Sequence, residues 1–148
     1  MNDRALSRYL HHRAGPELVA QSPHPGLGLV VAIPAHDEPD VLATLASLHA
    51  CERPECATEI IVLLNESDAA PPEVRARNAA SKQVIDTWAS ANNTPEWQVF
   101  AIHPSALPRR FAGVGLARKL AMDEALRRLH RVERIRWVIR SEEHTSEL

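Results

Sequence analysis

Two short apolar runs stand out in the first half of the chain, and a group of polar residues follows each. Residues 29–33 read LVVAI and residues 59–64 read EIIVLL. Runs this rich in β-branched residues, with almost no polar interruption, are typical of parallel strands that are covered on both faces. We therefore expect two central strands. The first should end at Pro34, because proline has no N–H to give to a sheet.

Apolar residues recur at helical spacing between the expected strands. Val41, Leu42, Leu45 and Leu48 form one apolar face of a helix that should end near Ala50. Further helices are expected over residues 3–14, 71–88 and 113–130, and further strands over residues 97–102 and 135–139.

The alternation of strands and helices predicts the fold class. It indicates an α/β protein with a Rossmann-like, doubly wound parallel sheet, helices on both faces and right-handed crossovers. The helix of residues 71–88 is expected to bury Val84, Ile85 and Trp88 against this sheet. We divide the chain into an N-terminal helix and loop (residues 1–26), the sheet domain (27–139) and a tail (140–148).

The tail, RSEEHTSEL, has no hydrophobic pattern of its own and follows a strand that has only begun. One string of codons that encodes it resembles a common sequencing-library adapter. We therefore interpret the tail as read-through and exclude it from the fold. On this interpretation the natural sequence breaks off inside or just after the fourth strand; a natural polar tail is the alternative.

Composition narrows the possible partners. The 148 residues carry a formal net charge of -2, which gives no electrostatic case for binding nucleic acid or an anionic membrane. The 8 histidines lack metal-ligand spacing, and the two cysteines, Cys51 and Cys56, suggest a reducing compartment. No apolar run approaches the ~20 residues that span a bilayer. With no secretory apolar stretch at the N-terminus, we expect a cytoplasmic protein.

Polar side chains follow both central strands. His36, Asp37 and Glu38 come after the first strand, and residues 65–68, NESD, come after the second. An open α/β sheet binds ligands at the carboxyl ends of its strands, and a helix N-terminus beside them favours anions. The competing interpretation is an ordinary strand–helix turn in which Asp37 or Asp40 caps the helix.

Three segments together resemble the family 2 glycosyltransferases. IPAHDEPDVLATLASL is similar to the start of that family, EIIVLLNESD to its second strand and acidic turn, and GVGLARKLAMDEAL to its glycine-opened helix. The segments occur in the family's order and spacing over residues 27–139. The resemblance implies a GT-A fold that binds a nucleotide-diphosphate sugar and transfers the sugar to an acceptor, which the sequence does not identify.

The resemblance also implies a set of substrate-binding residues. They are Pro34, His36, Glu38, Asn65, Asp68, Arg118 and Lys119. The first three would line the nucleotide pocket, the next two would lie near the base and ribose, and the last two would approach the diphosphate. The His36 ring would stack on or flank the base, and the guanidinium of Arg118 matches the geometry of phosphate oxygens.

The chain departs from the family in two places. Leu64 stands where the family often has an aspartate, so a carboxylate acceptor for the base is missing. The acidic motif that holds Mg²⁺ or Mn²⁺ would follow the fourth strand, where the tail begins. We therefore expect the metal and the catalytic base in the full-length protein and assign neither to this fragment, which should be inactive alone.

Two other functions remain open. A nucleotide-binding or interaction domain without transferase activity is favoured slightly by Leu64. A nucleotidyltransferase on a similar sheet is less favoured, because no glycine-rich, basic phosphate loop follows the first strand.

Overall fold

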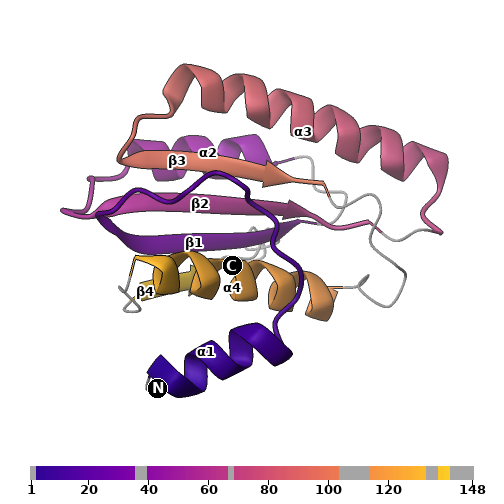
Figure 1. Ribbon diagram of the computed structural model, residues 1–148. Helices are drawn as coiled ribbons and strands as arrows, with labels where there is room; N and C mark the ends of the chain where they lie inside the picture. The colour runs from indigo at the N-terminus through magenta and orange to yellow at the C-terminus, as the bar shows by residue number, and fades with distance from the viewer. Residues whose placement is uncertain (1–2, 36–39, 67–68, 104–113, 133–136, 141–148) are drawn as a thin grey trace.

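The computed structural model describes residues 3–35, 40–66, 69–103, 114–132 and 137–140 (Figure 1). They form a four-stranded sheet in the order β3-β2-β1-β4, in which every neighbouring pair is parallel. The strands are β1 (Leu27–Ala35), β2 (Ala57–Leu64), β3 (Trp97–Ile102) and β4 (Trp137–Arg140). The helices are α1 (Asp3–His12), α2 (Val41–Ala50), α3 (Pro72–Asn92) and α4 (Val114–Arg131). The prediction of an α/β protein with a parallel sheet and flanking helices is confirmed.

Helices cover both faces of the sheet (Figure 1). On one face, Leu45 of α2 and Ile85 of α3 pack with alternate residues of the strands, among them Ile33 and Val62. On the other face, α4 packs against the remaining alternate residues through small and branched side chains, including Ala121 and Leu129. Because β1 and β2 are buried on both faces, their sequences read as continuous apolar runs.

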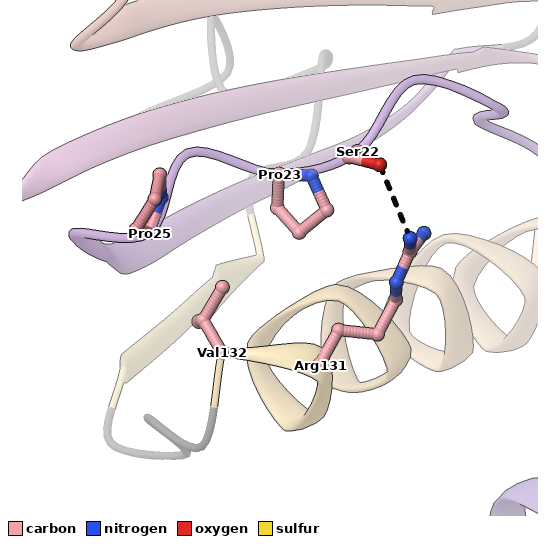
Figure 2. A pocket seen from close by; sticks show the side chains of 5 residues that line it. All are labelled: Ser22, Pro23, Pro25, Arg131 and Val132. Carbon is pink, nitrogen blue, oxygen red and sulfur yellow. Dashed lines mark hydrogen bonds between the residues drawn. The ribbon is translucent and has the colours of Figure 1, made fainter.

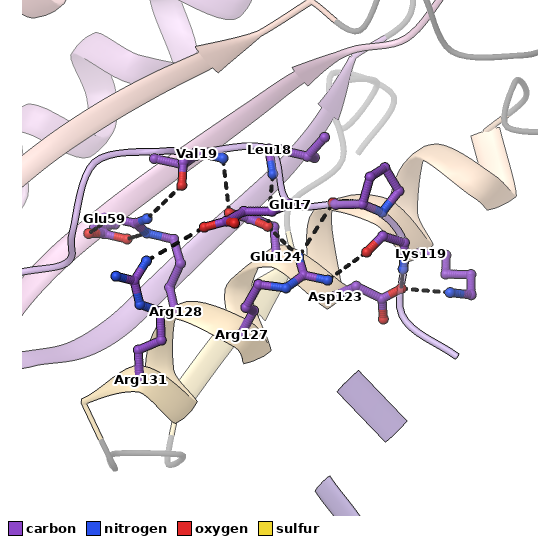
Figure 3. A network of polar contacts seen from close by, with 12 residues as sticks. Glu17, Leu18, Val19, Glu59, Lys119, Asp123, Glu124, Arg127, Arg128 and Arg131 are labelled. Carbon is purple, nitrogen blue, oxygen red and sulfur yellow. Dashed lines mark hydrogen bonds and ion pairs between the residues drawn. The ribbon is translucent and has the colours of Figure 1, made fainter. Parts of the chain in front are cut away.

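A segment without regular structure, residues 13–26, crosses the α4 side of the sheet; we call it the N-terminal strap (Figure 3). Polar contacts from α4 bind this strap. Glu124 of α4 accepts hydrogen bonds from the backbone N–H groups of Leu18 and Val19, at 3.1 and 3.0 Å. Arg128 forms a buried ion pair with Glu59 of β2 and donates to the carbonyl oxygen of Gln21 at 2.8 Å.

The expectation that β1 ends at Pro34 is wrong. β1 continues to Ala35, and Pro34 is the register partner of Leu63. Alternate residues of a strand direct their N–H and C=O groups to opposite neighbours. The carbonyl of Ala35 accepts a hydrogen bond on the β2 side, so the nitrogen of Pro34 faces the β4 side. The described pairing of β1 with β4 ends at Ala32, before Pro34. The sheet therefore needs no N–H from Pro34 on that side within the described residues.

The expected buried patch of α3 is wrong at one position. Val84 is 49% exposed, whereas Asn78, Ile85 and Ala89 are buried. Successive residues of a helix are about 100° apart, so Val84 and Ile85 cannot both face the sheet centrally. Trp88 is partly buried against the core, as expected.

The fourth strand ends one residue later than predicted. Residue 135, where the fourth strand was expected to begin, lies outside the described residues, and β4 spans Trp137–Arg140. Arg140, which we had assigned to the tail, pairs with Ala32 of β1. The remainder of the tail, 141–148, is also outside the described residues. Within the described part of the chain, no helix is long and apolar enough to cross a membrane.

Candidate functional site

The carboxyl ends of β1, β2 and β3 meet at one edge of the sheet, which we call the carboxyl rim. The register brings Ala35 level with Leu64, and Leu63 level with Ile102. Beyond β2, the N–H of Asn65 donates to the carbonyl oxygen of Ala35 at 2.6 Å, which ties the two strand ends together. Asn65 and His103, the first residues after β2 and β3, therefore leave the sheet from neighbouring strands.

The strand order marks one position on this rim. The chain moves from β1 to β2 to β3 in one direction and then returns to place β4 on the opposite side of β1. In open α/β sheets, ligands bind at such a reversal, outside the carboxyl ends of the strands. The segment that follows Ala35 begins at this point.

A buried polar cluster lies on the α3 side of the rim. The Glu66 carboxylate, with 3% of its side chain exposed, lies 2.9 Å from Nε2 of His103, whose side chain is 14% exposed. Glu66 also accepts a hydrogen bond from Nδ2 of Asn78 at 3.4 Å, and Nε of Arg75 is 3.9 Å from its other oxygen. The cluster joins residues from the ends of β2 and β3 to two turns of α3.

Asn78 is a polar residue buried in the first half of α3, and its hydrogen bonds explain why it is tolerated there. Its amide donates to the backbone carbonyl oxygen of Asn65 at 3.2 Å as well as to Glu66. A buried polar group must be hydrogen-bonded to avoid a large free-energy cost, and Asn78 meets this condition by binding the chain where it leaves β2. The position of the rim backbone is thereby fixed from the helix.

Of the predicted binding residues, two lie on the rim among the described residues. Pro34 is half-buried near the end of β1, and Asn65 is buried immediately after β2. His36, Glu38 and Asp68 lie outside the described residues, so their place in the site stays a prediction.

Arg118 and Lys119 have different surroundings. Arg118 lies in the first half of α4, where neighbouring residues pack on Ala32 and Leu63 near the carboxyl rim, on the face opposite α3. The Lys119 ammonium instead donates to Asp123 at 2.6 Å and to the backbone oxygen of Arg13 at 2.9 Å. The hydrogen bond with Asp123 raises the pKa of Lys119. Lys119 thus contacts the N-terminal strap, and its role at a diphosphate stays a prediction.

The sequence interpretation missed two residues of the rim, Glu66 and His103. Glu66 is part of the NESD segment, which was expected at the carboxyl end of the second strand, but it was not among the predicted binding residues. His103 is the first residue after β3, which is where an α/β sheet presents ligand-binding groups. The position of His103 directly after β3 is the sequence feature that could have identified it as a site residue.

The expected divalent metal finds no set of ligands in the described part of the chain. No group of three or more His, Cys, Asp or Glu side chains suited to a metal ion occurs there. Glu66 is already engaged by Asn78 and His103.

A pocket lies away from the carboxyl rim, between the N-terminal strap and the last turn of α4 (Figure 2). It is lined by Ser22, Pro23, Pro25, Arg131 and Val132. Arg131 extends across it and donates to Oγ of Ser22 at 3.4 Å. Because α4 runs antiparallel to the strands, this pocket lies toward their amino ends.

Comparison with protein-family models, with curated proteins and with solved structures finds no match to this chain.

Proposed function

We propose that this chain is the nucleotide-sugar-binding part of a family 2-like glycosyltransferase with a GT-A fold. The complete enzyme would transfer a sugar from a nucleotide-diphosphate sugar to an acceptor, with Mg²⁺ or Mn²⁺ held by residues outside the described part. The observation that carries the proposal is the strand order. The reversal at β1 coincides with the start of the HDE segment, the segment that resembles the family's nucleotide pocket.

Further features support a nucleotide diphosphate over other small ligands. Asn65 after β2 and His103 after β3 place an amide and an imidazole on the same rim as the strand reversal, and these groups suit the hydrogen-bonding groups of a nucleoside. Arg118 approaches the same end of the sheet from α4, near the helix N-terminus, where the helix dipole favours an anion.

The second candidate is a nucleotide-binding domain without transferase activity. Leu64 favours it, because β2 ends without the carboxylate that the family often uses for the base. Both candidates require nucleotide binding at the carboxyl rim. The coding sequence beyond the fourth strand separates them: an acidic metal-binding motif there supports the transferase, and its absence supports the binding domain.

Binding of nucleotides tests the proposal. Titration calorimetry with UDP-glucose, GDP-mannose, UDP and GDP, each with and without Mn²⁺, should show saturable binding of at least one diphosphate. Arg118→Ala should weaken that binding about tenfold through the loss of a charge-assisted contact with phosphate. Arg8→Ala is the matched control, since Arg8 is exposed on α1.

Two results would contradict the proposal. One is the failure of every nucleotide in the panel to bind the folded protein. The other is an equal loss of affinity in Arg118→Ala and Arg8→Ala, which would indicate a general attraction of anions to basic side chains.

A further inference from the structure

His103 is held in one orientation at the end of β3. Register pairing of Leu63 with Ile102 brings His103 level with Leu64, two residues before Glu66. The buried Glu66 carboxylate then reaches Nε2 of the ring at 2.9 Å. Asn78 and Arg75 lie against the same carboxylate, so Glu66 is itself restrained from α3.

This contact determines which ring nitrogen carries the proton. A carboxylate only accepts hydrogen bonds, so Nε2 of His103 must be the donor to Glu66. In the neutral ring the other nitrogen, Nδ1, then carries a lone pair and is an acceptor. Among the described residues, Glu66 is the hydrogen-bond partner of the ring. The His103 side chain is 14% exposed.

The location of His103 indicates which part of a nucleotide it would meet. β3 is the second strand from β1 in the sheet, and neighbouring strands are about 4.8 Å apart, so His103 is roughly 10 Å from the strand reversal. A diphosphate bound at the reversal would extend its nucleoside along the rim. The base, which is farthest from the phosphates, is the part that would reach the end of β3.

We propose that His103 is a specificity-determining residue that accepts a hydrogen bond at Nδ1 from a ring N–H of the nucleotide base, and that Glu66 is the positioning residue that fixes this tautomer. The inference rests on the proposed function. Uracil and guanine carry such a ring N–H, whereas cytosine and adenine present a bare ring nitrogen there. Two acceptors that face each other cost binding free energy, so the site favours uracil and guanine over cytosine and adenine.

Substitution by glutamine separates this role from a structural one. The amide nitrogen of His103→Gln takes the place of Nε2 and keeps the contact with Glu66, but no atom replaces Nδ1. We expect unchanged thermal stability and about a tenfold loss of the preference for UDP and GDP over CDP and ADP. Glu66→Gln, which no longer enforces one tautomer, should lower the same ratio. His12→Ala on α1 is the control and should leave the ratio unchanged.

Nitrogen-15 NMR of the histidine rings supplies a readout independent of binding. The proposal requires the Nε2–H tautomer for His103 at a pH where the ring is neutral, and a larger share of the Nδ1–H tautomer in Glu66→Gln. The opposite tautomer overturns the proposal, and so does a base preference that His103→Gln leaves unchanged. If no nucleotide binds, the proposed function itself fails; if nucleotides bind without a change in preference, only the role of His103 fails.

Discussion

At the scale of single residues, Arg128 makes an extensive set of buried polar contacts. Its guanidinium meets both oxygens of Glu59, at 2.5 and 2.9 Å, with 1% and 3% of the two side chains exposed. It also donates to the backbone oxygen of Gln21 in the N-terminal strap. A planar guanidinium suits this task because it donates to a carboxylate through two nitrogens and keeps a third for a carbonyl.

Removing one partner of this pair should be far more costly than removing both. Arg128→Leu leaves Glu59 buried without its counter-ion, and we expect the free energy of unfolding to fall by about 3–5 kcal/mol. The double variant Arg128→Leu with Glu59→Leu should recover much of that loss. Urea denaturation measures both, with Arg8→Leu on the exposed face of α1 as the control. Additive losses in the double variant would show that the two charges do not act as a pair.

The hydrogen bonds of Tyr9 and Lys119 with Asp123 predict a loss of stability at alkaline pH. The hydrogen bond from Tyr9 to Asp123 raises the pKa of Tyr9 above 10.0, and that from Lys119 to Asp123 raises the pKa of Lys119 above 10.5. A raised pKa in the folded state means that the stabilisation is complete below the unfolded value and is lost as pH rises through the folded value. The free energy of unfolding should therefore decline above about pH 10.

Denaturation at several alkaline pH values checks this expectation. Tyr9→Phe removes one of the two titrating groups and should flatten the decline. The account of these contacts would be wrong if the variant and the parent lost stability in parallel.

Sequence patterns could not identify the ion pair between Arg128 and Glu59. Glu59 read only as the first residue of an apolar strand, and Arg128 only as a charged helix residue. Arginine and acidic residues are rarely buried fully, so the residue types alone give no indication of a buried pair. Their 69-residue separation leaves no local spacing from which a contact could be inferred.

At the scale of elements, Gly28 has a defined packing role between β1 and β2. The β1–β2 register shifts between Leu27 and Leu29, and a Cβ added at Gly28 would lie 2.8 Å from Cβ of Cys56. Since Cys56 directly precedes β2, the crowding involves atoms fixed to two backbones. Gly28 thereby allows the two strands to come together at their amino ends.

Gly28→Ala should lower the free energy of unfolding by about 1–3 kcal/mol through overpacking. Adding Cys56→Gly removes the opposing Cβ and should restore part of the loss. Gly26→Ala is the comparison, because its nearest contact is the His24 ring, at 3.2 Å. A thermal melt of the four proteins gives the answer, and equal stability of Gly28→Ala and the parent would rule out the packing role.

The spacing of apolar residues along the chain predicted most of the helices and strands. The apolar runs predicted β1 and β2, and the spacing of Val41, Leu45 and Leu48 predicted α2 to its last residue. Two of the misplaced details were the extension of β1 through Pro34 and the exposed Val84 of α3. Both depend on the direction in which a backbone or side chain faces, and only the assembled sheet fixes that direction.

At the scale of the whole molecule, the alternation of strands and helices predicted the parallel sheet, and with it a common carboxyl rim. The strand order, which locates the reversal at β1, came from the structure. Likewise, the cluster of Glu66, Asn78 and His103 required the register of β2 with β3 and the placement of α3. Residues up to 37 positions apart meet there, beyond the reach of any local motif.

The central claim is that the carboxyl rim binds a nucleotide diphosphate. Backbone amide NMR of the protein during titration with UDP-glucose and GDP-mannose tests it most directly. The account predicts saturable shifts at Ala35, Asn65, Glu66 and His103, with little change at the opposite edge, where Gly26, Ala57 and Glu96 lie. Shifts confined to the opposite edge, or no shifts with either nucleotide sugar, would contradict it.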